Sequence, residues 1–130
     1  MKHFISLGGV AVMAALALSA CQSQRSSAPV PDKSALSTME RVAVAANSCW
    51  FKSGDPAFKD YRLAPELNSF SGRPRILAVP KRSPESRPAL VVQAEGHPAR
   101  LDAFGPLMQG PAGERIRHDV VRWANGAKGC

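Results

Sequence analysis

The N-terminal segment of this chain constrains the fold most, because it decides how much of the 130-residue sequence is left to build a domain. Lys2 and His3 precede an apolar run over 4–17. This run is too short for a bilayer, which takes about 20 residues. An apolar run behind a cation, followed by small residues, is typical of a cleaved signal peptide. We therefore expect residues 1–20 to be a signal peptide and the fold to come from the rest of the chain.

The expected signal peptide ends in Leu18-Ser19-Ala20-Cys21, which resembles the lipobox of bacterial lipoproteins. In that family the cysteine thiol receives a diacylglycerol, a signal peptidase cuts just before it, and the new amino group takes a further acyl chain such as palmitate. The resemblance implies that Cys21 is lipidated and holds the protein on a membrane, since several acyl chains anchor lastingly where one does not. The alternative is an ordinary secretory signal whose cysteine joins a disulfide.

The residues after Cys21 indicate which membrane holds the anchor and how the domain is connected to it. In Gram-negative lipoproteins an aspartate at the position of Gln22 favours the inner membrane, so the resemblance implies the outer membrane here, facing the periplasm. The stretch 22–35 is rich in Ser and Pro and is typical of a flexible tether. We expect residues 21–35 to be the lipidated cysteine with its tether, and residues 36–130 to form one small domain.

Cysteine usage predicts one disulfide. The sequence has three cysteines, and if Cys21 carries lipid, only Cys49 and Cys130 remain. A signal peptide places both outside the cytoplasm, where disulfides persist. Two free thiols, or a metal site with His97 and His118, are the alternatives, but these residues lack the short ligand spacing of zinc sites. We expect Cys49 and Cys130 to be paired and no metal to be bound.

Two segments carry helical patterns. Ser37 and Glu40 have capping-box spacing, and the apolar residues after them recur at helical intervals, which predicts a helix over about 37–50. Trp50 and the later Trp123 continue the apolar stripes of their segments, so we expect both in the core; the alternative is a role as partner anchors. The C-terminal segment has the most regular stripe in the chain, formed by Ile116, Val120, Trp123 and Ala124.

Between the helices the chain has the pattern of β-strands. Apolar runs at 75–80 and 89–94 predict two strands joined by the polar connector 81–88. Weaker strand patterns lie at 57–64 and 99–104. One sheet covered by two helices is the economical arrangement for this order of elements. We predict an α+β fold, with an antiparallel sheet of three or four strands flanked on one face by an N-terminal and a C-terminal helix.

The chain is strongly basic, with 17 Lys and Arg against 10 Asp and Glu and a net charge of +7. Such a balance favours anionic partners. We expect the predicted hairpin to gather four cations into an anion-binding patch that contacts lipid phosphates, anionic headgroups or polymer carboxylates. The alternative is a surface that keeps a small domain soluble. The four residues are Arg75, Lys81, Arg82 and Arg87.

Signals for catalysis or for a cofactor are weak. His97 lies in a predicted turn, and His118 neighbours Asp119, a spacing at which side chains do not face each other on a helix. No P-loop, dinucleotide or metal-ligand motif is present, so we expect no cofactor. Aromatic residues are not interleaved with basic ones, and the envelope address makes nucleic acid an unexpected partner. No convergence is visible among the carboxylates of Asp55, Asp60, Glu66 and Asp102.

Three segments of the body, CWFKSGDPAF, NSFSGRPRI and DVVRWANG, resemble small envelope lipoproteins of Gram-negative bacteria, such as those of alphaproteobacteria. The resemblance implies no particular activity. Together with the anchor and the charge, it leads us to expect a membrane-anchored, non-enzymatic binding or scaffolding module of the periplasm. Its partner would be an anionic envelope component or another envelope protein. A small periplasmic enzyme, or an inhibitor of one, is the alternative.

Overall fold

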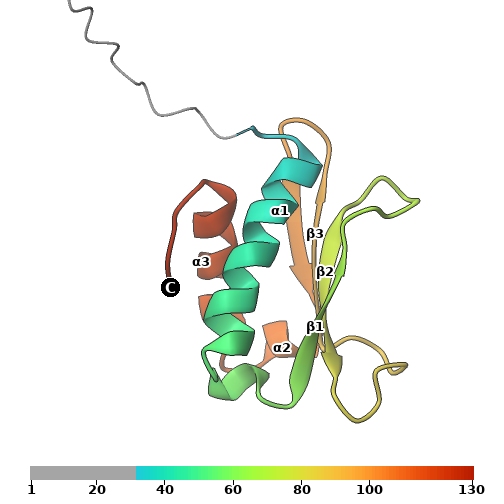
Figure 1. Ribbon diagram of the computed structural model, residues 1–130, viewed down its shortest axis with the longest axis vertical. Helices are drawn as coiled ribbons and strands as arrows, with labels where there is room; N and C mark the ends of the chain where they lie inside the picture. The colour runs from blue at the N-terminus through green and yellow to red at the C-terminus, as the bar shows by residue number, and fades with distance from the viewer. Residues whose placement is uncertain (1–31) are drawn as a thin grey trace, which may run out of the picture.

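The computed structural model describes residues 32–130 (Figure 1). The expected signal peptide, the lipidation site at Cys21 and most of the expected tether lie outside the described residues. Within residues 32–130, no helix is long and apolar enough to cross a membrane. The elements, in chain order, are α1 (Ala35–Ala46), the π-helical segment η1 (Asn47–Lys52), the 3-10 turn η2 (Pro56–Phe58), β1 (Tyr61–Glu66), β2 (Arg75–Pro80), β3 (Leu90–Glu95), β4 (Arg100–Phe104), α2 (Pro106–Gln109) and α3 (Gly113–Ala124).

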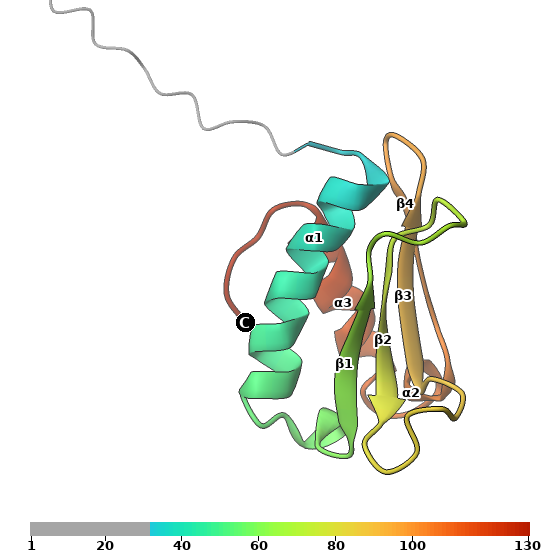
Figure 2. The same ribbon diagram turned by 45° about the vertical axis from the view of Figure 1, so that its right-hand side comes forward.

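The strands form one antiparallel sheet in the order β1-β2-β3-β4, so each strand lies beside its neighbour in sequence. Helices α1 and α3 lie together over one face of this sheet (Figure 2). The fold is therefore α+β, as the sequence predicted, with four strands. A sheet and a layer of helices bury one apolar face of each against the other.

Helix α1 begins earlier than the capping-box pattern predicted. Its N-cap is Ser34, whose side chain accepts a hydrogen bond from the Ser37 N–H at 3.3 Å, while Glu40 is exposed. The Ala35 N–H donates to the Gly96 carbonyl in the turn between β3 and β4, at 3.0 Å. This tertiary contact supplies a partner for one of the unpaired N–H groups of the first helical turn. The folded domain therefore starts within the stretch that was expected to be tether.

The strand predictions hold closely in the middle of the sheet and less well at its first edge. Strand β2 covers the predicted 75–80, and β3 is shifted by one residue from the predicted 89–94. The weak strand expected over 57–64 is wrong in its first half, because Asp55 caps the 3-10 turn η2 by accepting from the Ala57 N–H at 3.0 Å. Strand β1 starts only after this turn.

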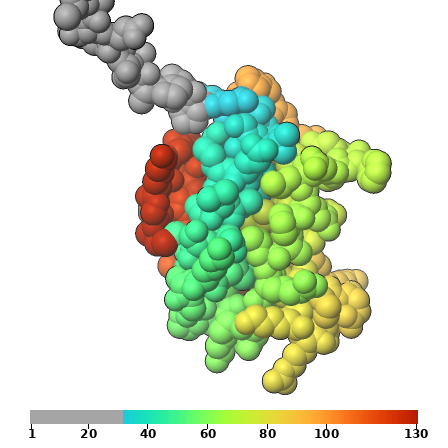
Figure 3. Space-filling view, in the orientation of Figure 1, coloured from blue at the N-terminus to red at the C-terminus, as the bar shows by residue number. Residues whose placement is uncertain are grey.

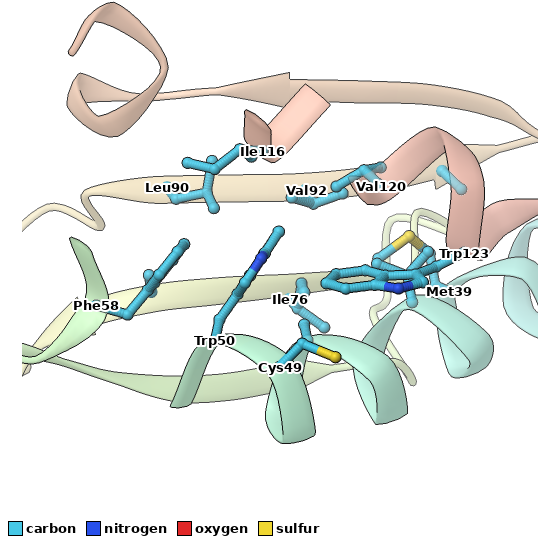
Figure 4. Close-up of a cluster of buried hydrophobic side chains, with 14 residues drawn as sticks. Met39, Cys49, Trp50, Phe58, Ile76, Leu90, Val92, Ile116, Val120 and Trp123 are labelled. Carbon is cyan, nitrogen blue, oxygen red and sulfur yellow. The ribbon is translucent and has the colours of Figure 1, made fainter. Parts of the chain in front are cut away.

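The core lies between the sheet and the two helices, with Trp50 at its centre (Figure 4). The ring of Trp50 stacks on Phe58, with centroids 4.7 Å apart and planes 5° from parallel. On its other side Trp50 meets Trp123 at 5.0 Å. Both tryptophans are 1% exposed, so they are core residues and not surface anchors. Each aromatic pair adds about 0.5–1.5 kcal/mol beyond the area that it buries.

A disulfide joins Cys49 to Cys130, as predicted, across 81 residues of sequence. Cys49 is in η1, where the widened π-helical turn brings two consecutive residues, Cys49 and Trp50, to the buried side. After α3 the chain turns back, so that the C-terminal segment lies along α1 (Figure 3). The indole N–H of Trp123 and the guanidinium of Arg122 both donate to the Gly129 carbonyl, at 3.0 and 3.2 Å. The disulfide thus closes the domain by holding its last residues against α1.

Candidate functional site

The structure separates the four cations that the sequence grouped. Lys81, Arg82 and Arg87 are exposed on the connector between β2 and β3. Arg75 is the first residue of β2 and pairs with Gln93, so it lies at the opposite end of the hairpin. Five residue steps of about 3.3 Å place it more than 15 Å from the connector. The expectation that all four gather at one place is therefore wrong for Arg75.

The charge of Arg75 also has a local partner. Arg75 lies directly across from Glu66 in the pairing of β1 with β2, and its Nε donates to the Glu66 carboxylate at 2.5 Å. At the same end of the sheet, Arg73 and Arg100 both reach Glu95, at 3.4 and 3.2 Å. These three arginines therefore each have a carboxylate partner, with Glu95 shared by two of them.

The other end of the sheet receives two cations that the sequence did not assign to it. Strand β1 pairs with β2 so that Arg62 lies opposite Val79, next to the connector. The Lys81 ammonium donates to the Lys59 carbonyl at 2.7 Å, which brings these two residues together. We call the resulting surface the basic end and define it by five exposed residues: Lys59, Arg62, Lys81, Arg82 and Arg87.

The cations of the basic end lack the ion pairs found elsewhere. Within residues 32–130, no salt bridge joins any of the five to a carboxylate. Two exposed carboxylates, Asp60 and Glu85, share this end, so positive charge is in excess there. Exposed cations without partners keep their charge available to an anionic surface, and they attract it within about a Debye length.

The basic end lies at the far side of the domain from the point where the chain enters it. Ala99, in the β3–β4 turn, donates its N–H to the Lys33 carbonyl at 2.7 Å, which ties the entering chain to that turn. In Figure 1 the start of α1 is at the top of the domain, whereas the 81–88 connector is at the bottom. An anchor ahead of Asp32 would therefore attach at the end opposite to the basic end.

A hollow of about 400 Å³ adjoins the basic end where η1 and η2 meet β1. Lys59, Arg62 and Lys81 line it together with Tyr61 and Phe51. The one carboxylate among the lining residues, Asp55, is held by Arg115 at 2.8 Å. The hollow thus places aromatic residues beside lysines that make no salt bridge among residues 32–130, which suits a ligand with an apolar face and an anionic group.

His97, the first of the two histidines considered for catalysis, lies near a carboxylate and a hydroxyl. The carboxylate lies between the imidazole and the hydroxyl, and this arrangement does not suit nucleophilic catalysis. Its Nε2 is 3.5 Å from the Asp32 carboxylate, and Ser34 Oγ donates to the other oxygen of that carboxylate at 3.1 Å. The backbone N–H of Ser34, with smaller contributions from its hydroxyl and from His97, lowers the pKa of Asp32 below its usual value. A serine nucleophile needs the imidazole, not the carboxylate, beside its hydroxyl. Asp32 and Ser34 instead form hydrogen bonds at the N-terminus of α1.

The remaining candidates for chemistry are dispersed. His118 is exposed on α3, whereas its neighbour Asp119 is buried and accepts a hydrogen bond from the Trp50 indole N–H at 3.0 Å. Asp102 is exposed on β4, at the opposite edge of the sheet from Glu66 on β1. Among residues 32–130, no group of three or more His, Cys, Asp or Glu side chains is placed to hold a metal ion.

Comparison with protein-family models, with curated proteins and with solved structures finds no match to this chain. The sequence pointed to Lys81, Arg82 and Arg87 through their density. It missed Arg62 and Lys59, because only the pairing of β1 with β2 and the bond from Lys81 to the Lys59 carbonyl bring them beside the connector.

Proposed function

We propose that this chain is a membrane-anchored envelope lipoprotein that acts as a non-enzymatic binding or scaffolding module. In this proposal Cys21 carries the lipid, and the basic end contacts an anionic component of the cell envelope. The observation that carries the proposal is the basic end itself, where five exposed cations make no salt bridge within residues 32–130, whereas Arg73, Arg75 and Arg100 at the other end each have a carboxylate partner.

Two further observations support the proposal. The lipobox-like segment that ends in Cys21 would anchor the chain in an outer membrane, and the Cys49–Cys130 disulfide suits an oxidising compartment such as the periplasm. The chain enters the domain at the end opposite to the basic end. This arrangement favours an anionic polymer in front of the domain over the headgroups of the membrane that holds the anchor.

Co-sedimentation of residues 22–130, which include the whole described fold, with purified cell-wall polymer tests this proposal. The test variant is Lys81→Gln, Arg82→Gln and Arg87→Gln combined. The control variant, Arg73→Gln, Arg75→Gln and Arg100→Gln, removes the same charge from the other end. Each cation near an anionic surface contributes about 1 kcal/mol. We expect the test variant to lose most of its binding and the control variant to keep it.

The salt dependence and the choice of surface complete the test. Binding of the unsubstituted protein should weaken from low to physiological ionic strength, because exposed charges are screened. Anionic vesicles, run in parallel, distinguish headgroups from polymer. Equal losses in both variants would mean that net charge alone matters. No binding to polymer or vesicles would refute the proposal.

A further inference from the structure

The hollow beside the basic end has walls that the core holds in place. Phe51 packs edge-on against Phe58, with ring centroids 5.2 Å apart, and Phe58 stacks on the buried Trp50. Tyr61 lies at the start of β1, opposite Pro80, and is half-buried. Phe51 and Tyr61 both line the hollow, and both pack against the core, which holds them in place. A wall that does not have to be ordered on binding loses little conformational entropy.

The rim of the hollow is positively charged. The bond from Lys81 to the Lys59 carbonyl, at 2.7 Å, holds the Lys81 ammonium at the rim and leaves two of its three donors free. Lys59 lines the hollow beside Lys81, whereas Arg62 alternates with Tyr61 and Leu63 along β1, so its side chain leaves the strand on the other face of the sheet. Asp55 does not cancel this charge, because it already accepts from Arg115 and from the Ala57 N–H.

We propose that the hollow binds one sugar residue that carries a carboxylate or phosphate group. The ring would lie against Tyr61 and Phe51, and its anionic group would lie between Lys59 and Lys81. This inference rests on the proposed function and makes the hollow the specific subsite of the basic end for an anionic glycan. The volume of about 400 Å³ lies in the lower part of the usual range for small-ligand sites, ~300–1,000 Å³.

The mixed lining favours a sugar over an acyl chain. Cations and the Asn47 amide border the aromatic surface, so a fully apolar ligand would cover polar groups without satisfying their hydrogen bonds. A sugar ring offers an apolar face to the aromatic side chains and hydroxyl groups to the polar rim. The larger apolar groove between α1 and the C-terminal segment, about 590 Å³, has Val44, Ala45 and Ala127 in its lining and lacks this combination.

The test is an NMR titration of ¹⁵N-labelled residues 22–130 with small probes. N-acetylmuramic acid supplies a carboxylate, N-acetylglucosamine 6-phosphate supplies a phosphate, and N-acetylglucosamine is the neutral control. We expect at least one anionic sugar to shift the amide signals of residues 59–62 and of Lys81, and to bind at least tenfold more tightly than the neutral sugar. The stronger of the two anionic probes identifies the source of the anionic group. Adenosine monophosphate that binds more tightly than both would overturn the assignment in favour of a nucleotide.

Substitutions distinguish binding in the hollow from attraction to the overall positive charge of the protein. Lys81→Gln should weaken binding of the preferred sugar about fivefold, since one cation near an anion contributes on the order of a factor of five. Lys33→Gln removes an exposed cation from the opposite end and should leave binding unchanged. Tyr61→Ala should weaken binding while Tyr61→Phe keeps it, with thermal unfolding measured for both to confirm that they fold.

The outcomes distinguish this inference from the function on which it rests. If no sugar shifts the signals of the hollow while polymer binding still depends on the basic end, the hollow is not a sugar site and the proposed function stands. If the neutral sugar binds as tightly as the anionic ones, the role given to Lys59 and Lys81 is wrong. If sugar and polymer binding are both absent, both proposals fail.

Discussion

At the scale of single residues, the buried polar contacts of this domain are concentrated on Asp119. This residue on α3 is 8% exposed and accepts from the Trp50 indole N–H at 3.0 Å. Arg122 and Arg115 reach its carboxylate at 3.4 and 3.7 Å. The carboxylate thus satisfies a donor at the centre of the core and is itself balanced by two cations. Such a group is costly to remove, because the donor that remains is buried without a partner.

Asp119→Ala should therefore lower the free energy of unfolding by about 1–3 kcal/mol, the cost of leaving a buried donor unpaired. Glu114→Ala is the matched control, because Glu114 pairs with Arg117 on the same helix but is 86% exposed. Exposed pairs contribute about 0–1 kcal/mol. Chemical denaturation of the three proteins measures the difference. An Asp119→Ala variant as stable as the control would show that this contact contributes little.

Gly113 is required by close packing between α2 and α3. A Cβ at this position would meet the Met108 carbonyl group, with the carbonyl carbon only 2.8 Å away. Alanine gains about 1 kcal/mol of helix propensity over glycine, but overpacking costs about 1–3 kcal/mol, so the clash should prevail. We expect Gly113→Ala to lower the melting temperature, whereas Gly110→Ala, with its nearest neighbour at 3.8 Å, leaves it unchanged. A Gly113→Ala protein that melts at the unsubstituted temperature would contradict this packing argument.

At the scale of elements, the sequence predicted what local patterns determine and missed what tertiary pairing determines. Strand β2 is apolar and short, so its limits are local and were predicted correctly. Ser34 caps α1 through a local bond to the Ser37 N–H, and a serine is a common N-cap, so this start could have been read from the sequence. The bond from the Ala35 N–H to the Gly96 carbonyl joins a distant turn, and no local pattern indicates it. Arg75 is separated from Lys81, Arg82 and Arg87 because it is the first residue of β2, so the whole strand lies between it and the connector.

The disulfide links two segments that each hold part of the core. It attaches the C-terminal residues to η1, next to Trp50, and so helps to keep the bond from Trp123 to the Gly129 carbonyl. A crosslink across 81 residues restricts the unfolded chain strongly, and disulfides typically contribute about 2–4 kcal/mol. The covalent closure is therefore a large part of the stability of so small a domain.

Cys49→Ala combined with Cys130→Ala should lower the free energy of unfolding by about 2–4 kcal/mol. For a domain of this size the melting temperature should fall by about ten degrees or more. Calorimetry of the variant beside the oxidised and the thiol-reduced unsubstituted protein measures the effect. The reduced protein should match the variant. Two titratable thiols in unreduced, unfolded residues 22–130 would show that the bond is absent.

At the scale of the whole molecule, the domain has two differently charged ends. At the end where the chain enters, Arg73, Arg75 and Arg100 pair with Glu66 or Glu95, whereas the five cations of the basic end make no salt bridge in the described part of the chain. This polarity gives an anchored domain a direction, with its charge available on the side away from the entering chain (Figure 1). The proposed anchor and the proposed partner can be tested separately.

The anchor is tested by Cys21→Ser in the full chain. A serine oxygen cannot replace the thiol in lipid transfer, so the variant should incorporate no labelled fatty acid and should keep its signal peptide. Metabolic labelling followed by mass spectrometry of the purified protein measures both. A Cys49→Ser variant controls for loss of a cysteine and should still be lipidated. Normal incorporation in the Cys21→Ser protein would contradict the lipoprotein proposal.

What the basic end touches in the envelope is measured most directly by site-specific photocrosslinking in intact cells. A photoreactive amino acid in place of Ser86, exposed on the 81–88 connector, keeps all five cations of the basic end. The same amino acid in place of Phe70, which is fully exposed on the 67–74 connector, probes the other end. We predict adducts with an anionic envelope polymer from position 86 and none from position 70. Equal adducts from both positions, or none from position 86, would contradict the account.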